Sequence, residues 1–119
     1  MTNLAEQHCV AIRKGSQPLS EEEIRGLAKE VPGWTVAARD GTPSLEKPFA
    51  FESFSDALAF TLKVGEAAEL ENHHPSLTTV WGRVTVAWWT HAVRGLHRND
   101  FIMAAKTDAL FGGSPRRGG

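Results

Sequence analysis

Four residues in one stretch of the sequence could do chemistry: Glu69, His73, His74 and His91. An imidazole gains and loses a proton near neutral pH, so these histidines could transfer protons or bind a metal ion. Glu69 precedes His73 by one helical turn, so its carboxylate could orient or acidify an imidazole. Pro75 follows the histidine pair directly and stiffens the segment that carries it. The cluster therefore predicts general acid and base chemistry on one substrate.

Two other interpretations of the histidines stay open. A single histidine more often caps a helix end or lies half-buried than takes part in a reaction. Three histidines can instead hold a zinc ion that keeps one position open for water. Adjacent histidines on a non-helical segment point in different directions, however, which is poor for two ligands of one metal. We favour the acid–base interpretation because the carboxylate, the pair and the strand-end histidine occur together, whereas His8 and His97 look isolated.

The composition indicates one soluble domain. A chain of 119 residues is the length of a single domain and can bury roughly two-thirds of its unfolded surface. The 13 basic and 14 acidic side chains give a net charge of -1, which argues against a nucleic-acid-binding face. Cys9 is the single cysteine, which excludes an internal disulfide and fits a reducing compartment. Without a membrane-length apolar run or a signal peptide, we expect a cytoplasmic protein that contacts no membrane.

Periodicity and turn signals predict the elements that must position the histidines. We expect an extended arm over residues 1–19, a single domain over 20–111 and a disordered tail over 112–119. Ser20 and Glu23 form a capping box, and the helix that they begin ends at Pro32-Gly33. Residues 34–38 and 45–51 are expected to be strands of a hairpin. Pro48 lacks an amide donor, so the second of these strands should lie at an edge or carry a bulge.

The longest helix is expected from Ser53 to near Asn72, because the residue before a proline avoids the α region. Strands are expected over 77–81 and 84–90, separated by Gly82-Arg83 in a type II′ turn, and a last helix begins near Asn99. The expected buried face of the longest helix combines apolar and small residues at helical spacing: Phe54, Ala57, Leu58, Thr61, Leu62 and Gly65, widened by Phe60, Val64, Ala67 and Ala68.

The order α-β-β-α-β-β-α predicts an α+β fold, a four-stranded antiparallel sheet with three helices packed on one face. The open face and the edges of such a sheet are available for self-association. In the last strand, one of Trp88 and Trp89 must face the helices, and the other must face outward with His91. The outward tryptophan would be a stacking platform for a flat ligand or part of an interface.

The sequence contains a set of motifs in and around the histidine cluster: Glu69-x-x-x-His73-His74-Pro75, Val84-x-Val86, Thr90-His91, Gly95-Leu96, Asp100, Pro18-Leu-Ser-Glu-Glu-Glu, Pro32-Gly33-Trp34, and Phe49, Phe51 and Phe54. Through these motifs, residues 9 to 111 resemble the pterin-4a-carbinolamine dehydratase family. The family has a four-stranded antiparallel sheet with three helices, and its members assemble as dimers or as tetramers built from dimers. Its reaction removes water from a 4a-hydroxytetrahydropterin and gives the quinonoid dihydropterin, without cofactor or metal.

The resemblance implies roles for the site residues. The leaving hydroxide needs a proton while a ring nitrogen loses one, so His73 and His91 are expected to be the acid and the base, typically worth ~10²–10⁴ in rate. His74 would position the substrate or shuttle a proton, and Glu69 would tune one of the histidines. The expected substrate-binding residues are Trp34, Pro75, Thr90 and Asp100.

Several positions depart from the usual pattern of the family, namely Ser76, Leu77, Trp81, Trp88, Trp89 and His97. Residues 88–100 resemble a branch associated with α-carboxysome and Rubisco genes, whose members are regarded as Rubisco assembly factors rather than enzymes. In that case Trp81, Trp88 and Trp89 are the candidates for an interface, since large aromatic side chains suit one. His97 replaces the usual serine or threonine cap of the last helix, which would cost about 1 kcal/mol unless Asn99 takes over.

Two functional hypotheses follow from these resemblances. The first, which we prefer at this point because of the intruding tryptophans and His97, is a Rubisco assembly factor with little or no dehydratase activity. It would bind the large subunit in the bacterial cytoplasm or at α-carboxysomes. The second is an active 4a-hydroxytetrahydrobiopterin dehydratase that binds a pterin, as the intact histidines and carboxylates suggest. Both would be homodimers or dimers of dimers, and neither needs a cofactor or a metal.

Overall fold

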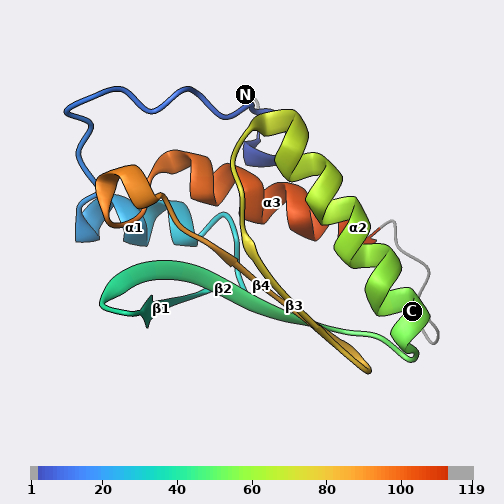
Figure 1. Ribbon diagram of the computed structural model, residues 1–119. Helices are drawn as coiled ribbons and strands as arrows, with labels where there is room; N and C mark the ends of the chain where they lie inside the picture. Colours follow the sequence, from blue (N-terminus) through green and yellow to red (C-terminus); the bar gives the residue numbers. More distant parts are fainter. Residues whose placement is uncertain (1–2, 113–119) are drawn as a thin grey trace.

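The computed structural model describes residues 3–112 (Figure 1). Its four strands form one antiparallel sheet in the order β1-β2-β4-β3, with the helices on one side of it, which confirms the expected α+β fold. The expected tail lies outside the described residues from residue 113 onward. No described helix is long and apolar enough to cross a membrane. The helices and strands are α1 (Glu21–Ala28), β1 (Thr35–Arg39), β2 (Thr42–Ala50), α2 (Phe54–Glu71), β3 (Ser76–Val80), β4 (Arg83–Trp88) and α3 (Arg98–Gly112).

The helix ends follow local sequence signals. The Ser20 hydroxyl accepts from the Glu23 amide and the Glu23 carboxylate accepts from the Ser20 amide, which confirms the capping box. The C-terminal end of α2 is capped by Asn72, which adopts a left-handed conformation with φ 52°. The Asn72 amide donates to the carbonyls of Ala68 and Glu69. The helix therefore ends where Pro75 predicted, and His73 is the first residue that turns away from it.

Pro48 lies in an interior strand, which corrects the expectation of an edge strand or a bulge. β2 pairs with β4 in regular register, with Pro48 opposite Thr85. On the other side, however, β1 pairs with β2 only as far as Glu46. Because the missing amide of Pro48 faces no partner strand beyond that point, the proline removes no ladder hydrogen bond. β2 is therefore an interior strand up to Glu46, and beyond that residue it is unpaired on the β1 side.

The turn between β3 and β4 differs from the type II′ turn expected at Gly82-Arg83. Val80 pairs with Arg83, so the two central residues of the turn are Trp81 and Gly82. Gly82 has φ 81°, whereas Trp81 is not among the residues with positive φ, which is the pattern of a type II turn. The shift places Trp81 at the tip of the hairpin, where 73% of it is exposed.

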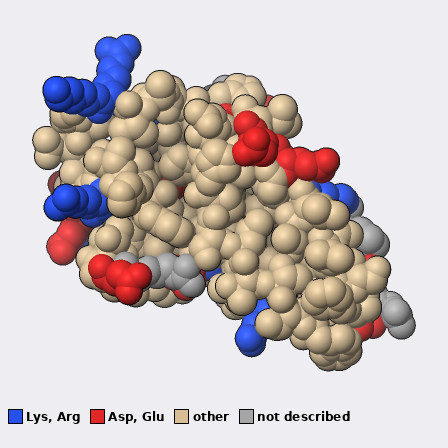
Figure 2. All heavy atoms as spheres, viewed as in Figure 1, with Lys and Arg blue, Asp and Glu red and all other residues tan. Residues whose placement is uncertain are grey.

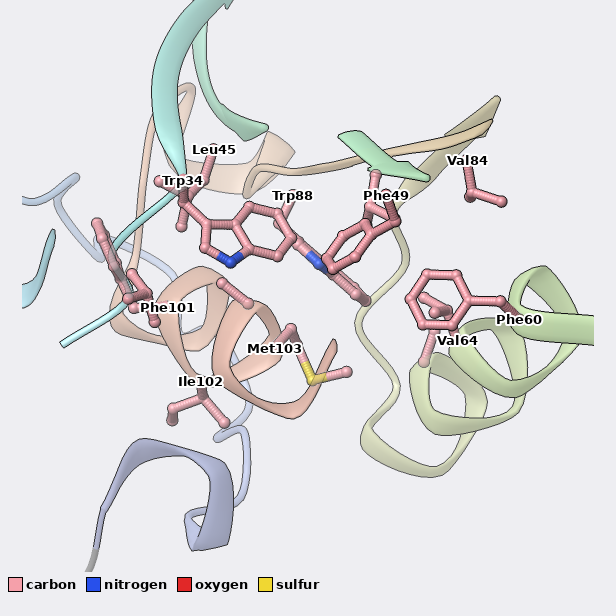
Figure 3. Packing of buried hydrophobic residues seen from close by; sticks show 14 of the residues in the cluster. Trp34, Leu45, Phe49, Phe60, Val64, Val84, Trp88, Phe101, Ile102 and Met103 are labelled. Atoms are coloured by element: carbon pink, nitrogen blue, oxygen red, sulfur yellow. The ribbon is translucent and has the colours of Figure 1, made fainter. Parts of the chain in front are cut away.

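The core lies between the helices and the sheet (Figure 3). Trp88 and Phe49 extend from the strands toward the helices, where α3 contributes Phe101 and Met103 and α2 contributes Phe60, all of them buried. The buried face of α2 consists of Ala57, Phe60, Val64 and Ala68.

Three residues expected in this core lie outside it. Phe54, Leu58 and Leu62 of α2 are 45%, 44% and 62% exposed. The helix is apolar on more than one side, so its period could not select the buried face, and the ring contacts of Phe60 with Phe49 and Phe51 fix it instead. The expectation for these three residues is therefore wrong, and they form an apolar stripe on the surface.

The N-terminal arm, residues 3–19, packs against the domain. It contains one short 3-10 helix, Leu4–Glu6, and Leu4 is buried in the core. The Leu19 amide donates to the Leu96 carbonyl at 2.8 Å. The arm thus contributes packing and hydrogen bonds to the same domain that it precedes.

Candidate active site

A buried hydrogen bond joins His73, just after α2, to Asp100 in the first turn of α3. Nε2 of His73 lies 2.6 Å from Oδ1 of Asp100, whose side chain is fully buried. The His73 ring also stacks on Trp88, with centroids 5.9 Å apart and planes inclined by 11°. The Trp88 indole is held in turn by a hydrogen bond of its Nε1 to Thr107. One carboxylate and one aromatic plane therefore fix the orientation of the imidazole.

Asp100 accepts hydrogen bonds from three donors. Besides His73, the Thr90 hydroxyl donates to Oδ2 at 2.8 Å and the His97 amide donates to the same oxygen at 2.9 Å. An ionised carboxylate can only accept, so a neutral His73 ring that bonds to it carries its proton on Nε2. In that tautomer Nδ1 is an acceptor, and no hydrogen bond from the described residues engages it. The geometry therefore suits His73 to the role of a base.

His97 caps α3, which corrects the expectation that its side chain loses the cap. The Asn99 amide donates to Nδ1 of His97 at 3.0 Å, and the His97 amide donates to Asp100. This arrangement resembles a capping box, except that an imidazole nitrogen replaces the usual hydroxyl and accepts from the second helical residue instead of the third. Burial lowers the pKa of His97, with the nearby Asp100 opposing the shift and His73 adding to it. His97 is therefore a neighbour of the site and not an isolated residue.

His74 pairs with Glu69 at the surface. Its Nε2 lies 2.5 Å from Oε1 of Glu69, and both side chains are mostly exposed. Glu69 therefore orients His74, and the left-handed turn at Asn72 directs His73 inward to Asp100 instead. Each histidine of the pair has its own carboxylate, one exposed and one buried.

A hollow of about 270 Å³ brings most of the expected catalytic residues together. His91 opens the short 3-10 helix His91–Val93 after β4, and it is exposed. The hollow is lined by Asn72, His73, His74, Trp89, Thr90 and His91. Asn72 and Trp89 are lining residues that the motif did not indicate. Glu69 and Asp100 are not lining residues, and each is hydrogen-bonded to a histidine that is one.

Trp89 forms a wall of this hollow without filling it. It is half-buried, and together with His91 it also lines a neighbouring hollow beside Asp40 and Thr42. Trp88 is fully buried and is therefore not available to a partner. Of the three tryptophans expected at an interface, Trp81 is the one that is largely exposed.

Trp34 and Pro75 occupy other places than the hollow. Trp34 lies in the core beside Phe49, where its Nε1 donates to Asp108 at 3.0 Å (Figure 3). Pro75 is half-buried directly before β3. Neither residue lines the hollow.

The described residues offer neither a metal cluster nor a reactive thiol. Among residues 3–112, no group of three or more histidine, cysteine or acidic side chains is arranged to hold a metal ion. Burial, together with the charges of Glu71 and Asp100, raises the pKa of the Cys9 thiol to about 12. The three imidazoles that line the hollow are groups suited to proton transfer with a bound molecule.

Sequence comparisons identify relatives along nearly the whole chain. A family model described as "Pterin 4 alpha carbinolamine dehydratase" matches residues 17–110. A Microcystis aeruginosa protein named "Putative pterin-4-alpha-carbinolamine dehydratase" is 53% identical over 111 residues, which are 93% of this chain and 96% of that protein. A Gloeobacter violaceus protein named "Putative pterin-4-alpha-carbinolamine dehydratase 1" is 53% identical over 108 residues, 91% of this chain and 93% of that protein.

Two solved structures with this fold are described as proteins of different function. A transcriptional coactivator/pterin dehydratase from Brucella melitensis has a TM-score of 0.72 and 31% identity, over 79% of this chain and 98% of that chain. A pterin dehydratase-like protein, described as a Rubisco assembly factor in the α-carboxysome, has a TM-score of 0.57 and 25% identity. That similarity covers 67% of this chain and 90% of the other.

Proposed function

The chain belongs to the pterin-4a-carbinolamine dehydratase family, and on that premise we propose that it dehydrates 4a-hydroxytetrahydropterins. The observation that carries the proposal is the buried pair of Asp100 and His73, which leaves Nδ1 of His73 as an acceptor beside a hollow that His74 and His91 also line. The relatives that are 53% identical carry dehydratase names, which supports the same activity.

The reaction requires one proton to leave a ring nitrogen and one to reach the departing hydroxide. We assign the base to His73, because Asp100 holds the proton on Nε2 and Nδ1 can accept. We assign the acid to His91, which is exposed at the rim and can take a proton from water. The C4a–O bond then breaks as His91 protonates the hydroxide, and the electron pair of the N–H bond forms the new C=N bond. Water and the quinonoid dihydropterin leave.

The other residues of the hollow would bind the flat ring. Trp89 presents an indole on which a pterin can stack, and such aromatic pairs contribute about 0.5–1.5 kcal/mol beyond buried area. His74, oriented by Glu69, can donate to a polar edge of the ring or pass a proton to solvent. No cofactor or metal takes part in this scheme.

The test of the proposal is turnover by purified variants. His73→Ala and His91→Ala should each lower kcat at least about tenfold while the circular dichroism spectrum stays unchanged. Trp81→Ala, at the far tip of the β3–β4 hairpin, is the matched control and should leave kcat unchanged. If both histidine variants turned over substrate at the wild-type rate, the assignment would be wrong.

A second candidate function is assembly of Rubisco through its large subunit, in the cytoplasm or at α-carboxysomes. Two observations support it, namely the structural similarity to an assembly factor and the exposure of Trp81. In a co-expression experiment, this function requires Trp81→Ala to lower the yield of assembled Rubisco and His91→Ala to leave it unchanged. The same two variants therefore distinguish the functions: dehydration depends on His91 and not on Trp81, whereas Rubisco assembly depends on Trp81 and not on His91.

We also propose that the chain self-associates through α2 and β3, with a second copy as the partner. β3 is an edge strand, and beside it lies an open apolar groove of about 850 Å³. Leu62 and Leu70 on this face are 62% and 86% exposed, and charged side chains are sparse on this side of the molecule (Figure 2). The groove is lined by Thr61, Leu62, Gly65, Glu66, Glu69, Leu70 and Leu77.

Light scattering with size-exclusion chromatography tests the self-association. Leu62→Lys should lower the molar mass to that of one chain, because the contact would have to bury the charged ammonium group. Val36→Lys places the same change on an exposed apolar residue of β1, the opposite edge strand, and should leave the mass of the assembly unchanged. A wild-type mass of one chain at micromolar concentration would refute the contact.

A further inference from the structure

A short segment of the N-terminal arm, residues 8–10, is bonded to the last residue of α2. We call this segment the strap. Oε1 of Glu71 accepts from the Cys9 amide at 2.7 Å, and Oε2 lies 2.7 Å from Nδ1 of His8. The Glu71 side chain is 11% exposed, whereas that of His8 is 79% exposed. Burial favours a raised pKa for Glu71, but the bonds from His8 and Cys9 hold it below its ordinary value.

The strap is also bonded to the start of α3. Asn99 is 2% exposed, and both ends of its amide are used by Val10: Oδ1 accepts from the Val10 amide at 3.0 Å, and Nδ2 donates to the Val10 carbonyl at 2.8 Å. This reciprocal pair resembles the pairing between two strands. Further along α3, Lys106 donates to the Ala5 carbonyl at 2.9 Å.

The two helix residues that hold the strap lie next to the buried catalytic pair. Glu71 precedes His73 by two positions, and Asn99 directly precedes Asp100. The Asn99 amide also donates to His97, so the cap of α3 and the strap meet in one residue. The charge of Asp100 reaches the Cys9 thiol, where it contributes to the raised pKa. The strap therefore links the end of α2 to the start of α3 where His73 meets Asp100.

We propose that the strap sets the geometry of the His73–Asp100 hydrogen bond, with Glu71 and Asn99 as positioning residues. Neither residue lines the hollow, so each acts through its neighbour in the chain. A clamp of this kind matters because a displacement of about 1 Å at a catalytic group can cost up to ~10²-fold in rate. This inference rests on the proposed dehydratase activity for its kinetic consequence, although the geometric consequence stands without it.

A matched pair of substitutions at one position separates the backbone of the strap from its side chain. Val10→Pro removes the amide that donates to Asn99, whereas Val10→Ala keeps that amide and shortens a side chain that is 62% exposed. We expect Val10→Pro to lower kcat about tenfold with little change in KM. Val10→Ala should behave as wild type. Asn99→Ala removes the same bond from the other side, so combining it with Val10→Pro should add little to the loss.

An NMR measurement supplies the readout that does not need activity. The ¹⁵N shifts of the His73 ring should change in Val10→Pro and not in Val10→Ala, because the bond to Asp100 is altered. A merely stabilising arm would lower the melting temperature of Val10→Pro and leave both kcat and the His73 shifts at their Val10→Ala values, which would overturn the proposal.

Two further outcomes separate this inference from the proposed activity. If the wild type and Val10→Ala are both inactive, the dehydratase assignment fails, and the His73 shifts alone still decide the role of the strap. If Val10→Pro does not fold, Glu71→Gln replaces it as the milder variant. Glutamine keeps an acceptor for the Cys9 amide and loses the charge toward His8, so the His73 shifts should move in the same direction. Unchanged shifts in Glu71→Gln would then refute the proposal.

Discussion

Replacing Asp100 with asparagine would keep the size of the side chain and change the partner that orients His73. Two donors, the Thr90 hydroxyl and the His97 amide, converge on Oδ2, so the asparagine oxygen must occupy that position. Its amide nitrogen then faces Nε2 of His73 as a donor. The bond can form only if Nε2 becomes the acceptor, which moves the proton of the neutral ring to Nδ1. The variant therefore keeps its hydrogen bonds and loses its base.

The two consequences differ widely in size. Neutral hydrogen bonds contribute about 0.5–1.5 kcal/mol and those to charged groups about 1.5–3 kcal/mol, so we expect the free energy of unfolding to fall by about 1–3 kcal/mol. Loss of a general base costs about 10²–10⁴ in kcat. A stability loss of this size leaves most of the protein folded, because the free energy of unfolding of a domain is typically about 5–15 kcal/mol.

Urea denaturation and dehydratase turnover on the same preparation check both numbers. Asp108→Asn is the control, because this residue lies further along α3 and accepts from Trp34 and Lys47. It should lose stability and keep the wild-type kcat. A folded Asp100→Asn protein with the kcat of the wild type would refute the assignment of His73 as the base.

Three further predictions concern titratable groups. The lowered pKa of His97 means that its contribution to stability is complete above its ordinary value near 6.5 and is lost as the pH falls below it. In denaturation at several pH values, His97→Ala should therefore cost about 1 kcal/mol at pH 7, and His97→Ser should keep the cap without this pH dependence. The lowered pKa of Glu71 gives stability that is present above its ordinary value and lost as the pH falls through the folded value, so Glu71→Gln should flatten the acid limb of the same profile. The raised pKa of Cys9, about 12, predicts slow alkylation by iodoacetamide at pH 8 in the folded protein and fast alkylation in urea, and equal rates would contradict its burial.

The sequence predicted the elements whose signals are local. The capping box at Ser20 and the stop before Pro75 depend on neighbouring residues alone, and both were correct. The buried face of α2 was not predictable in the same way, because Phe54 and Leu58 are as apolar as the Phe60 that packs inside. Contacts with Phe49 on another element decide between them.

The sequence predicted which residues form the site better than it predicted which of them are hydrogen-bonded to one another. The motif indicates His73, His74 and His91, which line one hollow. The spacing indicated that Glu69 acts on one of the histidines without deciding which, and the left-handed turn at Asn72 leaves His74 as its partner. The true partner of His73 lies 27 residues away, at a separation that only tertiary packing can bridge. The cap of α3 was expected to be lost at His97, because the imidazole nitrogen was not considered as an acceptor for a helix amide.

The most direct test of the proposed function is the turnover of 4a-hydroxytetrahydropterin by the purified protein, measured beside its own His73→Ala variant and an ordinary dehydratase. We expect acceleration comparable with that of the dehydratase in the wild type and a loss of at least about tenfold in the variant. A wild-type rate no faster than the reaction in buffer would contradict the proposed function and leave assembly of Rubisco as the candidate to examine.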